Sequence, residues 1–383
     1  MSDFLLNEVC ELIVDCPHTT ANDEGKGFPL VRTPNIGKGR LVYDGMHRVC
    51  EDVYNKRNAR AIPQENDLIF AREATAGNVA LIQKGEKVCL GQRTVLIRPN
   101  QEKVNPAFLT YFLLAPKQQY KLLSTANGAT VAHVNLPTIR NLKIDLPELP
   151  AQHRIASILS RYDSLIENYQ KQIKLLEEAA QRLYKEWFVD LHFPGHENTK
   201  IVDGVPEGWE KMKVDSIYSI KYGKILSTKL ITETGLFPVY GANGVIGYYD
   251  KANCNEQVVL ITSRGNGSGD VLVTYHKDSF ITNNSFVVTP LEGYEYCKLP
   301  FTFQFLKMAN FRAVRTGAAQ PQLTNQSIHT VDVVLPNRCL IEKYCAATVR
   351  MNDAIIKYRE QLRLLTEARD RLLPKLMSGE ITV

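Results

Sequence analysis

The stretch AQHRIASILSRYDSLIENYQKQIKLLEEAAQRLYKEW, residues 151–187, indicates the architecture of the whole chain. Its apolar side chains are separated alternately by four and three residues, which keeps one seam of a helix facing a partner helix. At about 1.5 Å per residue the segment would be a rod of roughly 55 Å, so it needs a parallel or antiparallel mate to bury its seam. The seam consists of Ile155, Leu159, Tyr162, Ile166, Tyr169, Ile173, Leu176, Ala180, Leu183 and Trp187.

A second seam of this kind lies 189 residues further along the same chain. The match also includes a Gly-Ala pair and a Leu-Pro pair upstream of the helix. Positions 128–187 and 317–376 share 15 identities in 60 without a gap, which unrelated amphipathic helices would not give. We therefore infer an internal duplication. The second seam consists of Tyr344, Thr348, Met351, Ile355, Tyr358, Leu362, Leu365, Arg369, Leu372 and Leu376.

Each helical segment follows a segment rich in short predicted strands. In the first half, apolar runs at 68–71, 79–82 and 94–98 are separated by Gly, Asn and Pro, and the run 106–119 is predicted to be one helix that starts at Pro106. The second half repeats this layout. We expect an α+β fold with a mixed α/β domain at 1–148, a long helix at 149–190, a second such domain at 191–336 that begins with a linker at 191–210, and a second long helix with a short tail at 337–383.

Composition places the chain among ordinary globular proteins. It has 383 residues, of which 44% are hydrophobic and 23% charged, and its apolar runs are too short to cross a bilayer. The acidic N-terminal stretch is unlike a signal peptide. Eight scattered cysteines without a Cys-x-x-Cys pair indicate reduced cytosolic thiols, with neither a disulfide framework nor a zinc site. A net charge of +5 permits a nucleic acid partner but does not argue for one.

We find no catalytic motif. The chain has no phosphate-binding P-loop, nucleophile elbow, His-Glu-x-x-His pair or deaminase signature, and its histidines form no ligand cluster. We therefore predict no catalytic residue, no metal and no cofactor on this chain. The glycine-rich stretch 264–270 is most simply a hairpin turn. The alternative is a loop whose amides and arginine meet a phosphate or a base edge.

Polar residues at the tips of predicted loops could instead read DNA. Asn and Gln pair bidentately with adenine, and Arg with guanine, although exposed Asn and Thr are more often simple turn formers. The two halves carry such residues at corresponding points, with Arg72 matched to Arg264 and the segment 128–133 matched to 317–322. The candidates are Arg72, Thr75, Asn78, Gln92, Arg93, Thr130, His133 and Asn135 in the first half, and Asn243, Arg264, Asn266, Asn283, Asn284, Gln320, Gln322 and Thr324 in the second.

An ordered set of motifs resembles the specificity (S) subunits of type I restriction-modification enzymes along essentially the whole chain. These motifs are Leu146-Pro147 followed by QHRIA at 152–156, LYKEWFVD at 183–190, FPGH at 193–196, GVPEGW at 204–209 and LMSGEITV at 376–383. The chain departs from the family pattern at 337–341, where the second helix opens without the usual Pro-x-x-x-Gln, and at Arg369 in the seam.

The resemblance implies two target-recognition domains, each of which reads one half of a split asymmetric site in double-stranded DNA. The two helices would pack antiparallel as a coiled coil, relate the halves by a pseudo-two-fold, set the spacing of the half-sites and dock two methyltransferase (M) subunits. S-adenosylmethionine would bind those partners, and motor-nuclease (R) subunits would complete a cytoplasmic complex. The chain itself would be non-catalytic.

Two other classes of function stay open on sequence grounds. One is a self-contained DNA-modifying enzyme, although the chain lacks the Asn/Asp-Pro-Pro-Tyr/Phe tetrapeptide of many methyltransferases. The other is a coiled-coil adaptor that binds only protein and does not read DNA.

Overall fold

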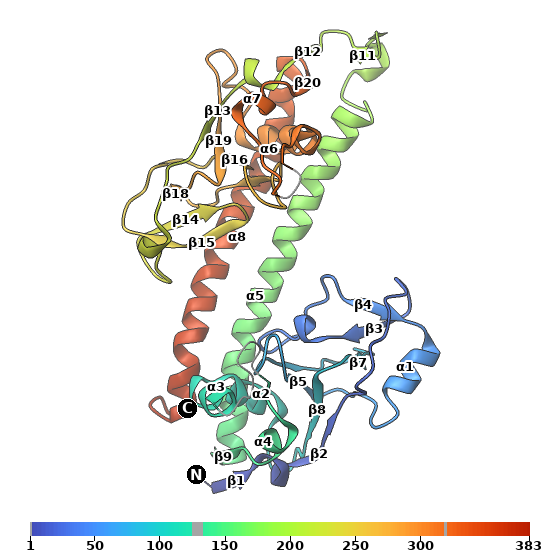
Figure 1. Ribbon diagram of the computed structural model, residues 1–383, viewed down its shortest axis with the longest axis vertical. Coiled ribbons are helices and arrows are strands. Elements are labelled where there is room, and N and C mark those ends of the chain that lie inside the picture. The colour runs from blue at the N-terminus through green and yellow to red at the C-terminus, as the bar shows by residue number, and fades with distance from the viewer. Residues whose placement is uncertain (1, 125–132, 318–319) are drawn as a thin grey trace. The chain divides into compact units, whose positions relative to one another are not determined.

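The structure is a computed structural model that describes residues 2–124, 133–317 and 320–383 (Figure 1). It divides into two compact units. Unit 1 comprises Met1–Glu167 and Leu362–Val383, and unit 2 comprises Asn168–Gln361. Each unit therefore combines one strand-rich domain with one end of each long helix, so neither helix packs as a body of its own.

The two long helices are α5 (Leu149–Tyr184), which continues into a π-helical turn at Lys185–Val189, and α8 (Arg338–Ser378). They are antiparallel within each unit, because early residues of one contact late residues of the other. In unit 2 the ring centroids of Tyr184 and Tyr344 lie 5.7 Å apart. All twenty seam positions are buried or half-buried. The unusual start of α8 has a local cause, since the side chain of Asn337 accepts a hydrogen bond from the Leu340 N–H (2.9 Å).

Unit 1 contains two sheets and a strand pair. The antiparallel four-stranded sheet has the order β2-β8-β5-β6, and the three-stranded sheet has the order β4-β3-β7 with β3 and β7 parallel. The strands are β1 (Ser2–Leu5), β2 (Cys10–Asp15), β3 (Phe28–Val31), β4 (His47–Val49), β5 (Leu68–Ala71), β6 (Val79–Leu81), β7 (Cys89–Leu90), β8 (Thr94–Pro99) and β9 (Lys143–Leu146), the last of which pairs with β1.

The helices of unit 1 do not all lie on one sheet, since the first contacts β3 and β7 of the three-stranded sheet and the second contacts β6 of the four-stranded sheet (Figure 1). They are α1 (Glu51–Arg57), α2 (Pro106–Leu114), α3 (Pro116–Ser124) and α4 (Leu136–Arg140). The prediction of one helix at 106–119 was wrong. Ala115 has an extended conformation (φ −65°, ψ 143°), because the ring of Pro116 disfavours a helical residue before it. Phe108 of α2 belongs to a buried cluster that also contains Ile155 and Leu376 of the long helices.

Unit 2 repeats this plan. Its strand orders, β13-β19-β16-β17, β15-β14-β18 and β12-β20, match those of unit 1 one for one, including a parallel pair, β14 with β18. The elements are β10 (Ile201–Val202), β11 (Val205–Pro206), β12 (Glu210–Lys213), β13 (Tyr218–Tyr222), β14 (Phe237–Gly241), β15 (Gly244–Tyr249), β16 (Val259–Thr262), β17 (Val271–Val273), β18 (Phe280–Ile281), β19 (Ser285–Pro290), β20 (Asp332–Leu335), α6 (Leu299–Met308) and α7 (Asn325–Ile328).

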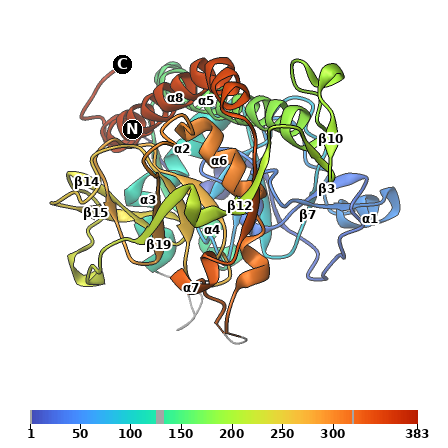
Figure 2. The same ribbon diagram turned by 90° about the horizontal axis from the view of Figure 1, so that it is seen from above.

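Helix α6 lies between α8 and strand β19 in unit 2 (Figure 2). Its Phe301 is fully buried and packs edge-on against Tyr344 of α8, with the ring centroids 6.3 Å apart. Strands β10 and β11 form a small hairpin inside the stretch expected to be a linker. None of the helices in the described ranges is long and apolar enough to cross a membrane.

Candidate nucleic-acid interface

Three loop segments of unit 1 meet at one end of the four-stranded sheet. The backbone N–H of Arg72, just after β5, donates to the carbonyl of Arg93, just before β8 (2.9 Å). The carbonyl of Arg72 in turn accepts from the N–H of Val134, in the segment before α4 (3.0 Å). The fold therefore brings together the turn after β5, the turn before β8 and the segment around His133, all of which carry predicted site residues.

The same three segments meet in unit 2 through equivalent hydrogen bonds. Ser263 donates to the carbonyl of Asn284 (2.8 Å) and accepts from the N–H of Leu323 (2.7 Å). The structural counterpart of Arg72 is therefore Ser263, and the match of Arg72 to Arg264 was wrong. The turn after β16 is one residue longer than the turn after β5. An alignment that matches the glycines near the ends of these turns therefore shifts the first residues of the turns by one position.

In unit 1, three predicted residues join one charged network organised by Glu73. The guanidinium of Arg72 is almost fully buried; it donates to Val134 O (3.0 Å) and to Nε2 of His133 (2.8 Å). Since a guanidinium can only donate, Nε2 accepts, and Nδ1–H donates to Glu73 (2.6 Å). The other oxygen of Glu73 pairs with Arg93 (2.8 Å), whose side chain is 61% exposed. Arg93 therefore presents a positioned cation, whereas Arg72 supports the loops.

Other predicted residues of unit 1 serve the loops themselves. The side chains of Thr75, Asn78 and Gln92 donate to the carbonyls of Thr33, Ile36 and His18, at 2.8, 2.9 and 2.9 Å. These donors are occupied, as expected of turn residues. Asn135 is half-buried at the N-cap of α4 and makes no capping bond through its side chain. Thr130 lies outside the described residues.

In unit 2, exposed polar side chains gather around the turn between β16 and β17. Arg264 and Asn266 are exposed on this turn, and the backbone of Arg264 pairs with that of Gln322, which is also exposed. Asn243 is exposed beside the turn, since a Cβ built on Gly267 would lie 3.0 Å from its Oδ1. Because β16 and β17 are antiparallel neighbours, the predicted hairpin is confirmed.

The remaining predicted residues of unit 2 differ in exposure. Gln320 is exposed, whereas Asn283 and Asn284 are half-buried at the turn before β19. The hydroxyl of Thr324 caps α7 by accepting from the N–H of Ser327 (3.1 Å). The sequence analysis missed Glu73 and Ser263, because their roles depend on hydrogen bonds to distant segments and no sequence motif identifies them.

Each domain is fixed to the long helices by different side chains. In unit 1 the buried carboxylate of Asp163 accepts from Tyr111 of α2 (2.6 Å) and pairs with Arg369 of α8 (2.8 Å). Burial, together with this carboxylate, raises the pKa of Tyr111 above its ordinary value. Arg369 thus departs from the seam pattern because it has a specific partner.

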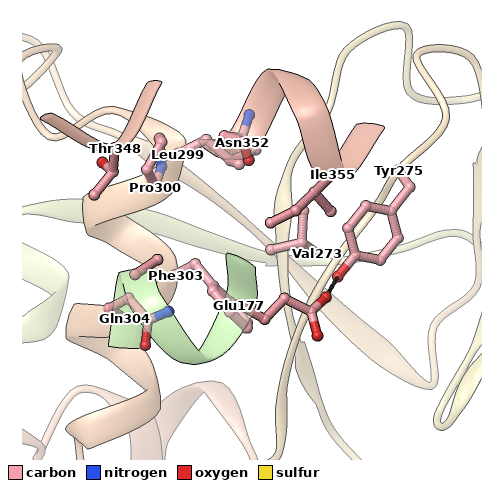
Figure 3. A pocket seen from close by; sticks show the side chains of 11 residues that line it. Glu177, Val273, Tyr275, Leu299, Pro300, Phe303, Gln304, Thr348, Asn352 and Ile355 are labelled. Atoms are coloured by element: carbon pink, nitrogen blue, oxygen red, sulfur yellow. Dashed lines mark hydrogen bonds between the residues drawn. The ribbon is translucent and has the colours of Figure 1, made fainter. Parts of the chain in front are cut away.

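Unit 2 has a cavity of about 40 Å³ at the corresponding place (Figure 3). The repeat offset of 189 equates Asn352 with Asp163 and Ala180 with Arg369, and both residues line this cavity. A different cluster fixes this domain to the helices. The guanidinium of Arg359 lies 3.6 Å from the ring centroid of Tyr275 and 2.7 Å from Glu177. The duplicated junctions have therefore diverged in chemistry.

The residues of the described ranges include no group of three or more His, Cys, Asp or Glu side chains able to hold a metal ion.

Comparisons with known proteins agree with a duplicated fold of this kind. The chain is 23% identical to the type I restriction enzyme MjaIX specificity subunit of Methanocaldococcus jannaschii, over 94% of this chain and 88% of that protein. It is 21% identical to the HindI specificity subunit of Haemophilus influenzae, over 75% and 80% of the two chains. The crystal structure of a type I restriction-modification S subunit from M. genitalium superposes with a TM-score of 0.61 at 19% identity, over 98% of this chain and 95% of that one.

The family described as "Type I restriction modification DNA specificity domain" matches this chain twice, at residues 1–178 and 206–339. The two matches correspond to the two halves of the duplication, and together they cover most of the sequence. The chain therefore belongs to the type I restriction-modification DNA specificity family.

Proposed function

We propose that this chain is the DNA sequence-specificity subunit of a type I restriction-modification complex, in which each strand-rich domain reads one half of a bipartite asymmetric site. The observation that carries the proposal is the repeated meeting of three loop segments, fixed by the bonds of Arg72 in unit 1 and of Ser263 in unit 2. A duplicated surface of this kind suits a divided recognition sequence, since each copy can diverge to read different bases.

The exposed side chains on the two surfaces have the chemistry that base edges require. Arg264 and Arg93 are exposed cations that can pair bidentately with guanine, and Asn266 and Gln322 can pair with adenine. Residues whose donors are already bonded, such as Asn78, would hold the loops in place. Base contacts would therefore come from a subset of the polar loop residues.

The long helices would set the half-site spacing and dock two methyltransferase subunits. Two leucines support docking on the helices, because they occupy counterpart positions in the repeat and both are well exposed: Leu175 is 53% and Leu364 is 44% exposed. The methyltransferase partners would bind S-adenosylmethionine and methylate adenine, and motor-nuclease subunits would complete a cytoplasmic complex. This chain would contribute recognition and assembly without a catalytic step.

Methylome sequencing of cells that contain this chain and its methyltransferase partner, with and without the gene for the chain, tests the proposal. We expect an asymmetric adenine-methylation motif in two parts that disappears when the gene is deleted. Unchanged methylation in an otherwise active system would contradict the proposal and favour an adaptor role.

A further inference from the structure

Unit 1 contains a pocket of about 210 Å³ whose lining is strongly basic. Arg32, Arg57 and Arg93 all line it, together with Gln92 and the hydroxyl-bearing Thr20 and Thr33. None of its lining residues is an Asp or Glu. The pocket shares Gln92 and Arg93 with the predicted DNA-reading surface, so it opens at the edge of that surface.

Arg57 is the most unusual of these cations, because it is only 5% exposed. Its guanidinium donates to three backbone carbonyls, those of Leu90 (2.5 Å), Thr19 (2.9 Å) and Pro17 (3.3 Å). Within the described ranges it has no carboxylate partner. These bonds orient the group and leave two of its five N–H donors unassigned. A buried charge without a counterion is costly, so an anion that supplied the missing charge would stabilise this arrangement.

Arg32 adds a second cation that is only partly satisfied. Its Nη2 donates to the carbonyl of Gly45 (3.0 Å), whereas its Nε is buried without a hydrogen-bond partner among the described residues. Backbone hydrogen bonds from Arg48 and Gly25 are the largest causes that lower the pKa of Asp23, and the charge of Arg32 also lowers it. That carboxylate is engaged elsewhere, since it accepts from the N–H groups of Gly25 (3.0 Å) and Arg48 (2.9 Å).

We propose that this pocket binds one phosphate group of the DNA backbone. Planar guanidinium groups match phosphate geometry and are preferred for its recognition, and Thr and Gln side chains commonly add neutral contacts to it. The proposal rests on the proposed function, because the DNA must already lie across unit 1 for a backbone phosphate to reach Arg32 and Arg57. In unit 2 the corresponding stretch between β15 and β16, all of whose residues the structure describes, contains no helix like α1, which supplies Arg57, so the anchor belongs to one half-site only.

The test uses the full chain in complex with its methyltransferase partners, and it measures affinity for target and non-target duplexes over a range of salt concentrations. Arg32→Gln should weaken binding by the same factor for both duplexes and lower the slope of log affinity against log salt by about one. Arg32→Lys should retain most of the slope. Arg48→Gln is the matched control, because Arg48 also donates to one backbone carbonyl but does not line the pocket.

A second arm replaces single backbone phosphates by neutral methylphosphonates. One position should weaken binding of the unmodified complex and have no further effect on the Arg32→Gln complex. The pocket assignment would be overturned if Arg32→Gln and Arg48→Gln gave equal salt slopes and no methylphosphonate position behaved in this way. Target binding by the unmodified complex would still uphold the proposed function. Absence of target binding by the unmodified complex would instead overturn the proposed function. If inorganic phosphate raises the melting temperature only when Arg32 is present, and no methylphosphonate position weakens binding, the DNA backbone would be overturned as the source of the phosphate in the pocket.

Discussion

Arg369 of α8 and Asp163 of α5 form an ion pair at 2.8 Å that is largely removed from water, with their side chains 17% and 4% exposed. The residues are 206 positions apart in the sequence and belong to different copies of the repeat. Their counterparts in unit 2, Ala180 and Asn352, are uncharged, so neither copy of the junction contains an unpaired charge at these positions.

We expect Arg369→Ala to lower the free energy of unfolding by about 3–5 kcal/mol, because it leaves the buried carboxylate of Asp163 without its cation. The double variant Arg369→Ala with Asp163→Asn reproduces the residues of unit 2 and should cost less than the single variant. Denaturant unfolding of both variants measures this difference. Arg371→Ala is the control, since Arg371 is 78% exposed and its pair with Glu367 should contribute little. A double variant less stable than Arg369→Ala would contradict the account of the pair.

The sequence predicts the long helices well, because their seams depend on a periodicity that tertiary contacts do not disturb. It fails where the register depends on bonds between distant segments. The glycines of two turns align Arg72 with Arg264, and only the backbone bonds to Val134 and Leu323 identify Ser263 as the counterpart. Likewise, the sequence shows Arg369 only as a departure from the seam pattern, whereas the structure shows that it forms an ion pair with Asp163. Base contacts are the least predictable, since loop residues such as Asn78 and Asn266 are alike until their hydrogen bonds are known.

Two asparagines in corresponding turns should separate loop support from DNA reading. Asn78→Ala removes the bond to Ile36 O and should cost about 1 kcal/mol of stability, with a smaller effect on the recognised sequence. Asn266→Ala should leave stability within about 0.5 kcal/mol, because its exposed side chain has no hydrogen bond among the described residues, and should weaken target binding. Thermal unfolding and duplex binding of both variants check this. The reverse pattern would exclude Asn266 as a reader.

Leu175→Glu and Leu364→Glu should each weaken the docking of one methyltransferase subunit. A charge on an exposed leucine at the centre of an interface disrupts association more than folding, so the melting temperature of the chain should change little. Native mass spectrometry should show complexes with one methyltransferase subunit for each single variant and none for the double variant. Lys171→Glu, which changes another exposed position of α5, serves as the control. If the double variant still binds two methyltransferase subunits, these subunits dock on another surface of the chain.

Buried tyrosines should make the fold sensitive to alkali. Burial raises the pKa of Tyr275 to about 12, above the value of about 10 in an unfolded chain. Between these values the unfolded chain releases a proton that the native chain retains. The stabilisation is therefore complete below about pH 10 and is lost as the pH rises towards 12. The melting temperature should fall over this range, and Tyr275→Phe should reduce the decline. An equally steep decline in that variant would exclude a contribution from Tyr275.

The measurement that tests the central claim most directly is methylome sequencing of cells that carry variants in one recognition surface at a time. Arg264→Gln with Asn266→Ala should relax or change the bases of one half of the methylated motif, and leave the other half and the spacer intact. Arg93→Gln with Asn135→Ala should affect only the opposite half. Changes in both halves from either variant, or an unaltered motif from both, would contradict a chain in which each domain reads its own half-site.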